Sequence, residues 1–177
     1  MSAFSTEGKV ALVTAATMGI GLASAKALAK SGALTYIAGL NDQAAEDAIK
    51  ECKAEKLPVK FIEYNAFDYS SYEKIIKTIV DAEKHLDIVV NNFGMGNPKK
   101  DFDLLNGDPE AFFDILHVNI ASVYLSCRYA IPHMIEQGGG SIVNIASIGG
   151  IQPDISRLGY TTAKAAIIYM TKEIAVQ

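Results

Sequence analysis

The sequence has few cysteines, no long apolar run and no candidate metal-binding cluster. Its two cysteines, Cys52 and Cys127, have no metal-type spacing and no neighbouring cysteines, which indicates reduced thiols in a cytoplasmic protein. The three histidines form no ligand cluster, so we expect no metal site. No apolar run approaches the roughly 18 residues that span a bilayer. The N-terminus has no charged segment followed by an apolar core, so we expect no signal peptide.

Basic residues do not cluster either. The net charge is −4 and the chain has no basic block, which argues against nucleic acid and anionic membranes as partners. Half of the residues are hydrophobic (50%) and a fifth are charged (20%), as in a compact soluble protein. A length of 177 residues predicts a single domain over residues 1–177.

Short apolar segments alternate with helical patterns along the whole chain. The segments read as strands cover residues 9–14, 34–38, 59–64, 86–92 and 141–147. The segments read as helices cover residues 22–30, 42–55, 70–85, 109–137 and 159–176. Continuous apolar strands are typical of a parallel sheet covered on both faces. The sequence therefore predicts an α/β fold with a doubly wound parallel sheet in a three-layer αβα arrangement, and a bend or break at Pro132.

A glycine-containing turn joins the first strand to the first helix. Strand, glycine turn and helix N-terminus together form a dinucleotide-binding arrangement, because free amides and the helix dipole face the pyrophosphate. A glycine pair alone is a weak signal, and here the strand before it and the helix after it give the required context. The candidate cofactor contacts in this turn are Thr14, Ala16, Thr17, Gly19, Ile20 and Gly21.

Ser147, Tyr160 and Lys164 form the candidate chemical centre. Tyr160 and Lys164 are four residues apart on a predicted helix, so the ammonium can stand beside the phenol and favour its charged form. Ser147 ends a predicted buried strand, where α/β sheets bind ligands, and can hydrogen-bond the reacting oxygen. The alternative is a half-buried aromatic, a solvated surface lysine and a serine that caps a helix.

The order Ser147, then Tyr160-x-x-x-Lys164, resembles the active site of the short-chain dehydrogenase/reductase family. The turn with Thr14, Gly19 and Gly21 and the segment Asn91-Asn92-x-Gly94 fall in the same order as in that family. The resemblance implies a Rossmann-type fold and hydride transfer with a nicotinamide cofactor, which Asn92, Phe93, Gly94, Tyr160 and Lys164 would also contact. It assigns catalysis to Ser147, Tyr160, Lys164 and Asn119, with Asn119 kinking its helix and holding a water beside the lysine.

Two residues depart from the family pattern. Ala15 stands where the family motif Thr-Gly-x-x-x-Gly-x-Gly has its first glycine, and alanine disfavours a positive φ angle. We expect the turn to tolerate it. Phe93 replaces the alanine of Asn-Asn-Ala-Gly, and we favour core packing for its ring over contact with the cofactor or an apolar substrate.

The residues after the second strand bear on the choice of cofactor. An acidic residue there binds the ribose of NAD, whereas a basic one accepts the 2′-phosphate of NADP. The resemblance puts Gly39 at the acidic position and Leu40 at the basic one, and Asn41 could bind either cofactor. We favour NADP(H) over NAD(H).

Two aspartates have two readings each. Asp42 either reaches the ribose or caps the next helix. The resemblance puts Asp68 and Tyr69 against the adenine, and Asp68 is also suited to cap the helix that follows it.

Four segments resemble the bacterial 7α-hydroxysteroid dehydrogenases of this family: residues 91–96, 105–108, 131–136 and 141–160. This implies a small-molecule substrate and either oxidation of the 7α-hydroxyl of a bile acid or reduction of the ketone. The alternatives are a 3-oxoacyl-thioester or sugar reductase of the same family, and an inactive dinucleotide-sensing protein. Such sensors typically lose the tyrosine or the lysine, and both are present here. A serine hydrolase would need Gly-x-Ser-x-Gly, whereas Ser147 lies in Ile-Ala-Ser-Ile-Gly.

The resemblance also carries expectations about assembly and length. The helices over residues 109–137 and 159–176 are the pair that usually forms the family's dimer interface, so we expect a homo-oligomer, either a dimer or a tetramer. Family members continue through two more strands. We therefore expect that the C-terminal strands are absent and that the domain is truncated at that end.

Overall fold

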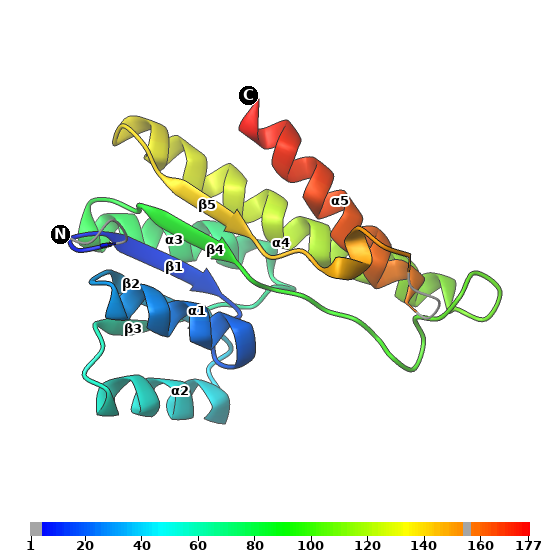
Figure 1. Cartoon of the computed structure of the whole chain (residues 1–177), viewed down its shortest axis with the longest axis horizontal. Helices are drawn as coiled ribbons and strands as arrows, with labels where there is room; N and C mark the ends of the chain where they lie inside the picture. The colour runs from blue at the N-terminus through cyan, green and yellow to red at the C-terminus, as the bar shows by residue number, and fades with distance from the viewer. Residues whose placement is uncertain (1–4, 154–156) are drawn as a thin grey trace. The chain divides into compact units, whose positions relative to one another are not determined.

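The computed structural model describes residues 5–153 and 157–177 (Figure 1). Their contacts form two compact units. The first unit comprises the chain up to Asn92 together with Leu125–Val143. The second unit comprises Phe93–Tyr124 and Asn144–Gln177. The single-domain organisation stays a prediction.

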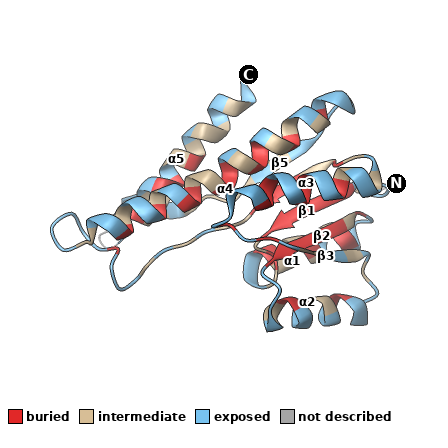
Figure 2. Ribbon diagram, turned by 180° about the vertical axis from the view of Figure 1, so that it is seen from behind, coloured by how far each residue is buried: buried red, intermediate tan, exposed pale blue. Residues whose placement is uncertain are grey.

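A five-stranded parallel sheet forms the centre of the first unit, in the order β3-β2-β1-β4-β5. The strands are β1 (Val10–Thr14), β2 (Leu34–Gly39), β3 (Val59–Glu63), β4 (Ile88–Asn91) and β5 (Ser141–Asn144). Val13 is in register with Ile37 of β2 and with Val90 of β4. All of β1 is buried (Figure 2), as a continuous apolar strand between two neighbours and two covering layers should be.

Helices cover both faces of this sheet, with α1 (Gly19–Lys30) on one face and α3 (Tyr69–Glu83) on the other (Figures 1 and 2). The third helix of the unit, α2 (Gln43–Ala54), contacts β3. A stripe at helical spacing on α3 is buried: Ser71, Tyr72, Ile75, Ile76 and Ile79. The predicted doubly wound α/β fold is confirmed.

The remaining helices follow β4 and β5 in the chain. Helix α4 (Pro109–Glu136) begins in the second unit and ends in the first. It continues through Pro132 without a break. The missing proline N–H costs only one hydrogen bond, and the other bonds of this long helix hold it together. The second unit also holds a short 3₁₀ helix, η1 (Ile148–Gly150), which contacts α5 (Leu158–Ala175).

Several predicted boundaries were wrong, each for a local reason. Helix α1 begins at Gly19 rather than at residue 22, because Gly19 and Gly21 already belong to its first helical turn. Strand β4 starts at Ile88 rather than at residue 86, because the Gln137 side chain takes both backbone groups of Leu86. Strand β5 ends at Asn144 rather than at residue 147, and it is only partly buried because it is the edge of the sheet.

Candidate active site

Lys164 is buried beside Tyr160 on one face of α5. Its side chain is 1% exposed, and its Nζ lies 5.7 Å from the centre of the Tyr160 ring. Nζ donates hydrogen bonds to the carbonyl oxygens of Ile145, at 2.9 Å, and of Phe93, at 3.2 Å. Burial lowers the pKa of the Lys164 ammonium from its ordinary value. The alternative of a solvated surface lysine is therefore wrong.

Ser147 and Tyr160 line the same pocket. The pocket has a volume of about 410 Å³, and Gly149, Arg157 and Thr161 are also in its wall. Ser147 lies three residues beyond the end of β5 and caps η1, since its Oγ accepts from the Gly149 N–H at 3.2 Å. The helix-capping reading is thus correct. It still leaves the Ser147 O–H available as a donor toward the pocket.

Asn119 is fully buried in the middle of α4, and its side chain holds the segment after β4. Its Oδ1 accepts from the Met95 N–H at 3.1 Å, and its Nδ2 donates to the carbonyl oxygens of Met95 and Ile115, both at 2.8 Å. Gly94 lies against the lysine, since a Cβ there would be 3.2 Å from Lys164 Nζ and 3.9 Å from Asn119 Oδ1. The structure therefore brings Asn119, Gly94 and Lys164 together.

The glycine turn of the first unit is tightly closed. Asn92 donates from Nδ2 to the Ala15 carbonyl at 2.9 Å, and its N–H donates to Thr14 Oγ1 at 3.1 Å. A Cβ on Gly21 would lie 2.6 Å from both the Ala15 oxygen and Asn92 Nδ2, so no side chain fits there. Ala15 adopts a φ of 49°, a left-handed conformation that alanine disfavours, and the turn accommodates it as expected.

The candidate cofactor residues at the ends of β2 and β3 lie in the same unit. Gly39 packs against Thr17, because a Cβ there would lie 2.6 Å from Thr17 Cγ2. Asp42 caps α2 by accepting from the Ala45 N–H at 3.1 Å. Asp68 caps α3 by accepting from Ser70 N and Oγ, and these bonds lower the pKa of its carboxyl. The capping roles are confirmed, and the predicted contacts of Asp68, Tyr69 and Asn41 with cofactor stay predictions.

The residues at the N-terminus of α1 and at the ends of β2 and β3 suit a bound dinucleotide. No side chain caps the N-terminus of α1 and no acid lies in its first turn, so its positive end suits a phosphate. Apolar side chains at the turn and at the ends of β2 and β3 are exposed, as a planar base requires: Met18, Ile20, Leu40, Phe67 and Tyr69.

Main-chain groups of three residues that support the site were missed from the sequence. The carbonyls of Phe93 and Ile145 hold Lys164, and the backbone of Met95 holds Asn119. Backbone atoms leave no residue-type signal, which is why the pattern did not reveal them. The Phe93 side chain is half-buried, and the role of its ring stays a prediction.

The described residues (5–153 and 157–177) hold neither a metal-ligand cluster nor a membrane-spanning helix. They contain no group of three or more potential metal ligands among His, Cys, Asp and Glu. None of their helices combines the length and the apolar character needed to cross a membrane.

Comparison with known proteins places these features in a family. A sequence profile for the short chain dehydrogenases matches residues 9–177. The chain is 47% identical over 171 residues to a 7alpha-hydroxysteroid dehydrogenase from Clostridium sardiniense, covering 97% of this chain and 65% of that protein. It is 48% identical over 171 residues to the enzyme of the same name from Paraclostridium sordellii, covering 97% and 64%. The chain thus spans somewhat less than two thirds of the length of these relatives.

The fold comparison agrees. A crystal structure of an actinorhodin polyketide ketoreductase with NADPH superimposes with a TM-score of 0.88 at 26% identity, covering 95% of this chain and 64% of that one. The sequence profile thus covers almost the whole chain. The chain belongs to the short-chain dehydrogenase/reductase family.

Proposed function

We propose that the protein is an NAD(P)-dependent oxidoreductase that transfers hydride between a nicotinamide and a secondary alcohol or ketone. The observation that carries the proposal is the grouping of Lys164, buried and hydrogen-bonded, with Tyr160, which shares a pocket with Ser147. An inactive sensor has no need for a lysine buried in this way, since burying an amine opposes its charged form.

In this mechanism Tyr160 is the acid and base. In the oxidative direction its deprotonated oxygen accepts the hydroxyl proton of the substrate, and in the reductive direction its O–H returns a proton to the carbonyl oxygen. Ser147 donates its O–H to the same oxygen. Its Oγ accepts from the Gly149 N–H, and this bond leaves the hydroxyl hydrogen to be donated. The nicotinamide, when bound, accepts or supplies the hydride.

Lys164 supports Tyr160 in two ways. An ammonium has three N–H donors, and two of them bond the carbonyls of Phe93 and Ile145, which fixes its position. We assign the third to the ribose or the phenol oxygen. The positive charge lies beside the phenol ring, where it stabilises negative charge that develops on the reacting oxygen. Asn119, close to the lysine, extends the proton path through a water, as in the family.

For the cofactor we propose NADP(H). Gly39 carries no side chain, so no acid at that position repels a 2′-phosphate. The polyketide ketoreductase of similar fold was solved with NADPH. Thr14, Ala16, Gly19, Ile20 and Gly21 are assigned to the pyrophosphate end, and Asp68 with Tyr69 to the adenine. Comparison of KM for NADP⁺ and NAD⁺ tests this, and a lower KM for NAD⁺ would contradict it.

For the substrate we propose the 7α-hydroxyl of a bile acid, supported by relatives of that name at 47% and 48% identity. The test is reduction of NADP⁺ or NAD⁺, followed by absorbance, with cholate, its 7β epimer and a simple secondary alcohol. Turnover of cholate and not of the 7β epimer is expected. Preference for acetoacetyl thioester in the reverse reaction would favour the 3-oxoacyl reductase alternative instead.

Two further proposals concern assembly and location. Exposed aromatic side chains on α4 and α5 support a homo-oligomer, a dimer or tetramer, and they include Phe113, Tyr124 and Tyr169. Light scattering of the purified protein tests it, and a monomer mass would contradict it. The free thiols Cys52 and Cys127 support a cytoplasmic location.

A further inference from the structure

The first turn of α5, which carries Tyr160, has no cap of its own. Arg157 occupies the capping position and makes no side-chain capping bond. A helix that starts this way leaves the N–H groups of its first turn without partners. In this chain the missing partners come from a distant segment, residues 97–108, which we call the capping loop.

Asp101 of the capping loop supplies most of the cap. Its Oδ1 accepts from the Gly159 N–H at 2.7 Å and its Oδ2 from the Tyr160 N–H at 3.0 Å, while the Phe102 carbonyl accepts from the Leu158 N–H at 3.2 Å. Asp101 is only 4% exposed. One buried carboxylate thus binds the backbone of the candidate catalytic tyrosine and of the residue before it.

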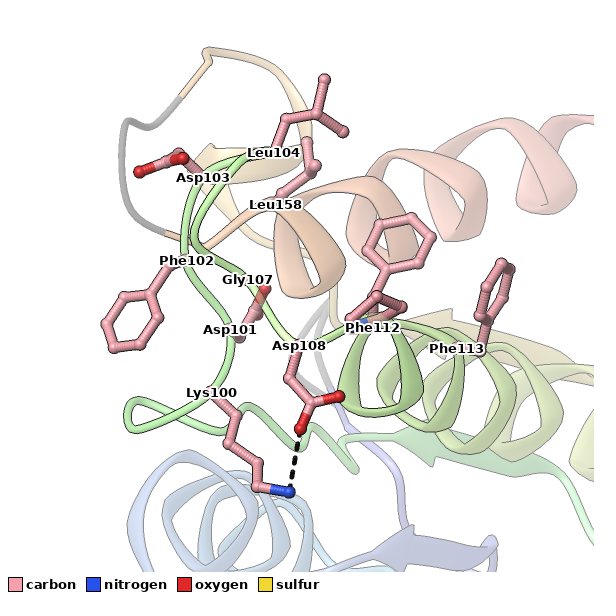
Figure 3. A pocket seen from close by; sticks show the side chains of 11 residues that line it. Lys100, Asp101, Phe102, Asp103, Leu104, Gly107, Asp108, Phe112, Phe113 and Leu158 are labelled. Carbon is pink, nitrogen blue, oxygen red and sulfur yellow. Dashed lines mark ion pairs between the residues drawn. The ribbon is translucent and has the colours of Figure 1, made fainter.

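The Asp101 carboxylate lies close to the backbone of Gly159. A Cβ on Gly159 would lie 3.2 Å from Asp101 Oδ1 and 3.4 Å from the Phe112 Cα, so glycine makes the approach possible. The loop is braced on the other side, where Lys100 pairs with Asp108 at 3.0 Å (Figure 3) and the Asp101 N–H donates to the Asn97 carbonyl at 2.7 Å. Contacts within the capping loop therefore hold Asp101 in place independently of its bonds to α5.

Its charge also bears on Tyr160. Within the part of the chain that the structure describes, the charged groups around Tyr160 are Lys164 on the same helix, Arg157 in the same pocket and Asp101. Lys164 and Arg157 place positive charge near the phenol, whereas the Asp101 carboxylate places negative charge at the helix start, where it offsets the helix dipole.

We propose that Asp101 is a positioning residue for Tyr160. It fixes where α5 begins and so the direction in which the phenol enters the pocket, and it moderates the positive field around that phenol. This inference rests on the proposed function only for its kinetic effects. The capping geometry itself is independent of it.

The test replaces Asp101 with asparagine, which keeps the shape but can accept from only one of the two amides, because its NH₂ group faces the other donor. We expect kcat to fall about 10- to 100-fold, as a small misplacement of a reacting group does, with KM for cofactor changed less than twofold. The rising limb of the oxidative pH–rate profile should move to lower pH, since a negative charge is lost. A purely structural role would lower the rate without moving the profile.

Asp103→Asn is the matched control. Asp103 lies in the same loop and also accepts backbone N–H groups, from Leu105 and Asn106, but it is exposed and its bonds stay inside the loop. We expect kcat and the pH profile of this variant to stay within twofold of the original protein. An equal loss in both variants would overturn the proposal, because it would indicate general damage to the loop.

Amide hydrogen exchange provides a measurement that does not depend on activity. The amides of Gly159 and Tyr160 should both exchange slowly in the original protein, and the one that loses its acceptor in Asp101→Asn should exchange at least tenfold faster there, while amides of β1 are unchanged. If these amides exchange equally in both proteins, the capping role fails. If they differ but no substrate is turned over by the original protein, the proposed function fails and the cap stands. Should Asp101→Asn not fold, Gly159→Ala, which crowds the same carboxylate, must give the same acceleration, and its absence would overturn the proposal.

Discussion

In the first unit the turn after β1 is held by close packing around small residues, whereas in the second unit the candidate catalytic residues are held by buried hydrogen bonds. Gly21 has no room for a methyl group against Ala15 and Asn92. Lys164, Asn119 and Asp101 instead lie almost entirely out of solvent and bond main-chain atoms. The difference suits the two tasks, because a phosphate needs bare backbone and a proton transfer needs fixed polar groups.

The largest expected effect is at Tyr160. Tyr160→Phe removes one oxygen at a half-buried position, so the fold should survive while turnover falls by about 10²- to 10⁴-fold. Initial rates with cholate measure this, with Tyr169→Phe as the control on the exposed part of the same helix. Retained activity in Tyr160→Phe would remove the tyrosine from the mechanism.

The next effect tests the close packing of the turn in the first unit. Gly21→Ala must move backbone, so we expect a loss of about 1–3 kcal/mol in the free energy of unfolding and a clearly weaker affinity for cofactor. Gly138→Ala is the control, since its Cβ would meet open space and only its φ of 90° is strained. It should lower stability without changing cofactor binding, as measured by fluorescence titration. Equal affinities in the two variants would contradict close packing as the cause.

Lys164 makes the second unit sensitive to pH. Burial lowers the pKa of its ammonium in the folded state, so the unfolded chain binds more protons between that lowered pKa and about 10.4. The stability of the original protein relative to Lys164→Met should therefore rise with pH across that window, by up to about 1.4 kcal/mol per pH unit. Urea unfolding of both proteins at a series of pH values measures this. A difference that is flat or falls with pH would contradict it.

The smallest effect concerns the strained turn of the first unit. Ala15→Gly relieves the cost of a φ of 49° and adds flexibility to the unfolded chain, so we expect a net gain of about 0.5–1 kcal/mol. Thermal unfolding with and without cofactor measures it. A loss of stability would mean that the Ala15 methyl makes contacts worth more than the strain.

The contrast between close packing in the first unit and buried hydrogen bonds in the second also explains what could be predicted from the sequence. The sheet, its helices and the glycine turn follow from local patterns, namely apolar strands, helix periodicity and the caps at Asp42 and Asp68. Tyr160 and Lys164 follow from their spacing on one helix. Ser147 was placed at the end of a strand, but the chain leaves the sheet at Asn144 and brings the Ile145 carbonyl to Lys164.

Asp101 could not be found in this way. It lies in a polar loop more than fifty residues before the helix that it caps, and no local pattern connects the two. The only trace in the sequence is negative, in that α5 starts after Arg157 with no capping side chain of its own. Tertiary contacts between polar groups leave no periodicity, which is why the hydrogen bonds of Asp101, Asn119 and Lys164 to distant main-chain groups appear only in the structure.

The most direct test of the account is the pH dependence of kcat for alcohol oxidation in the original protein and in Lys164→Met. If the buried ammonium makes the Tyr160 phenol a usable base, the rising limb of the profile moves to higher pH when the charge is removed. If the limb stays in place and only the maximum rate falls, Lys164 acts by binding alone and the central claim is wrong.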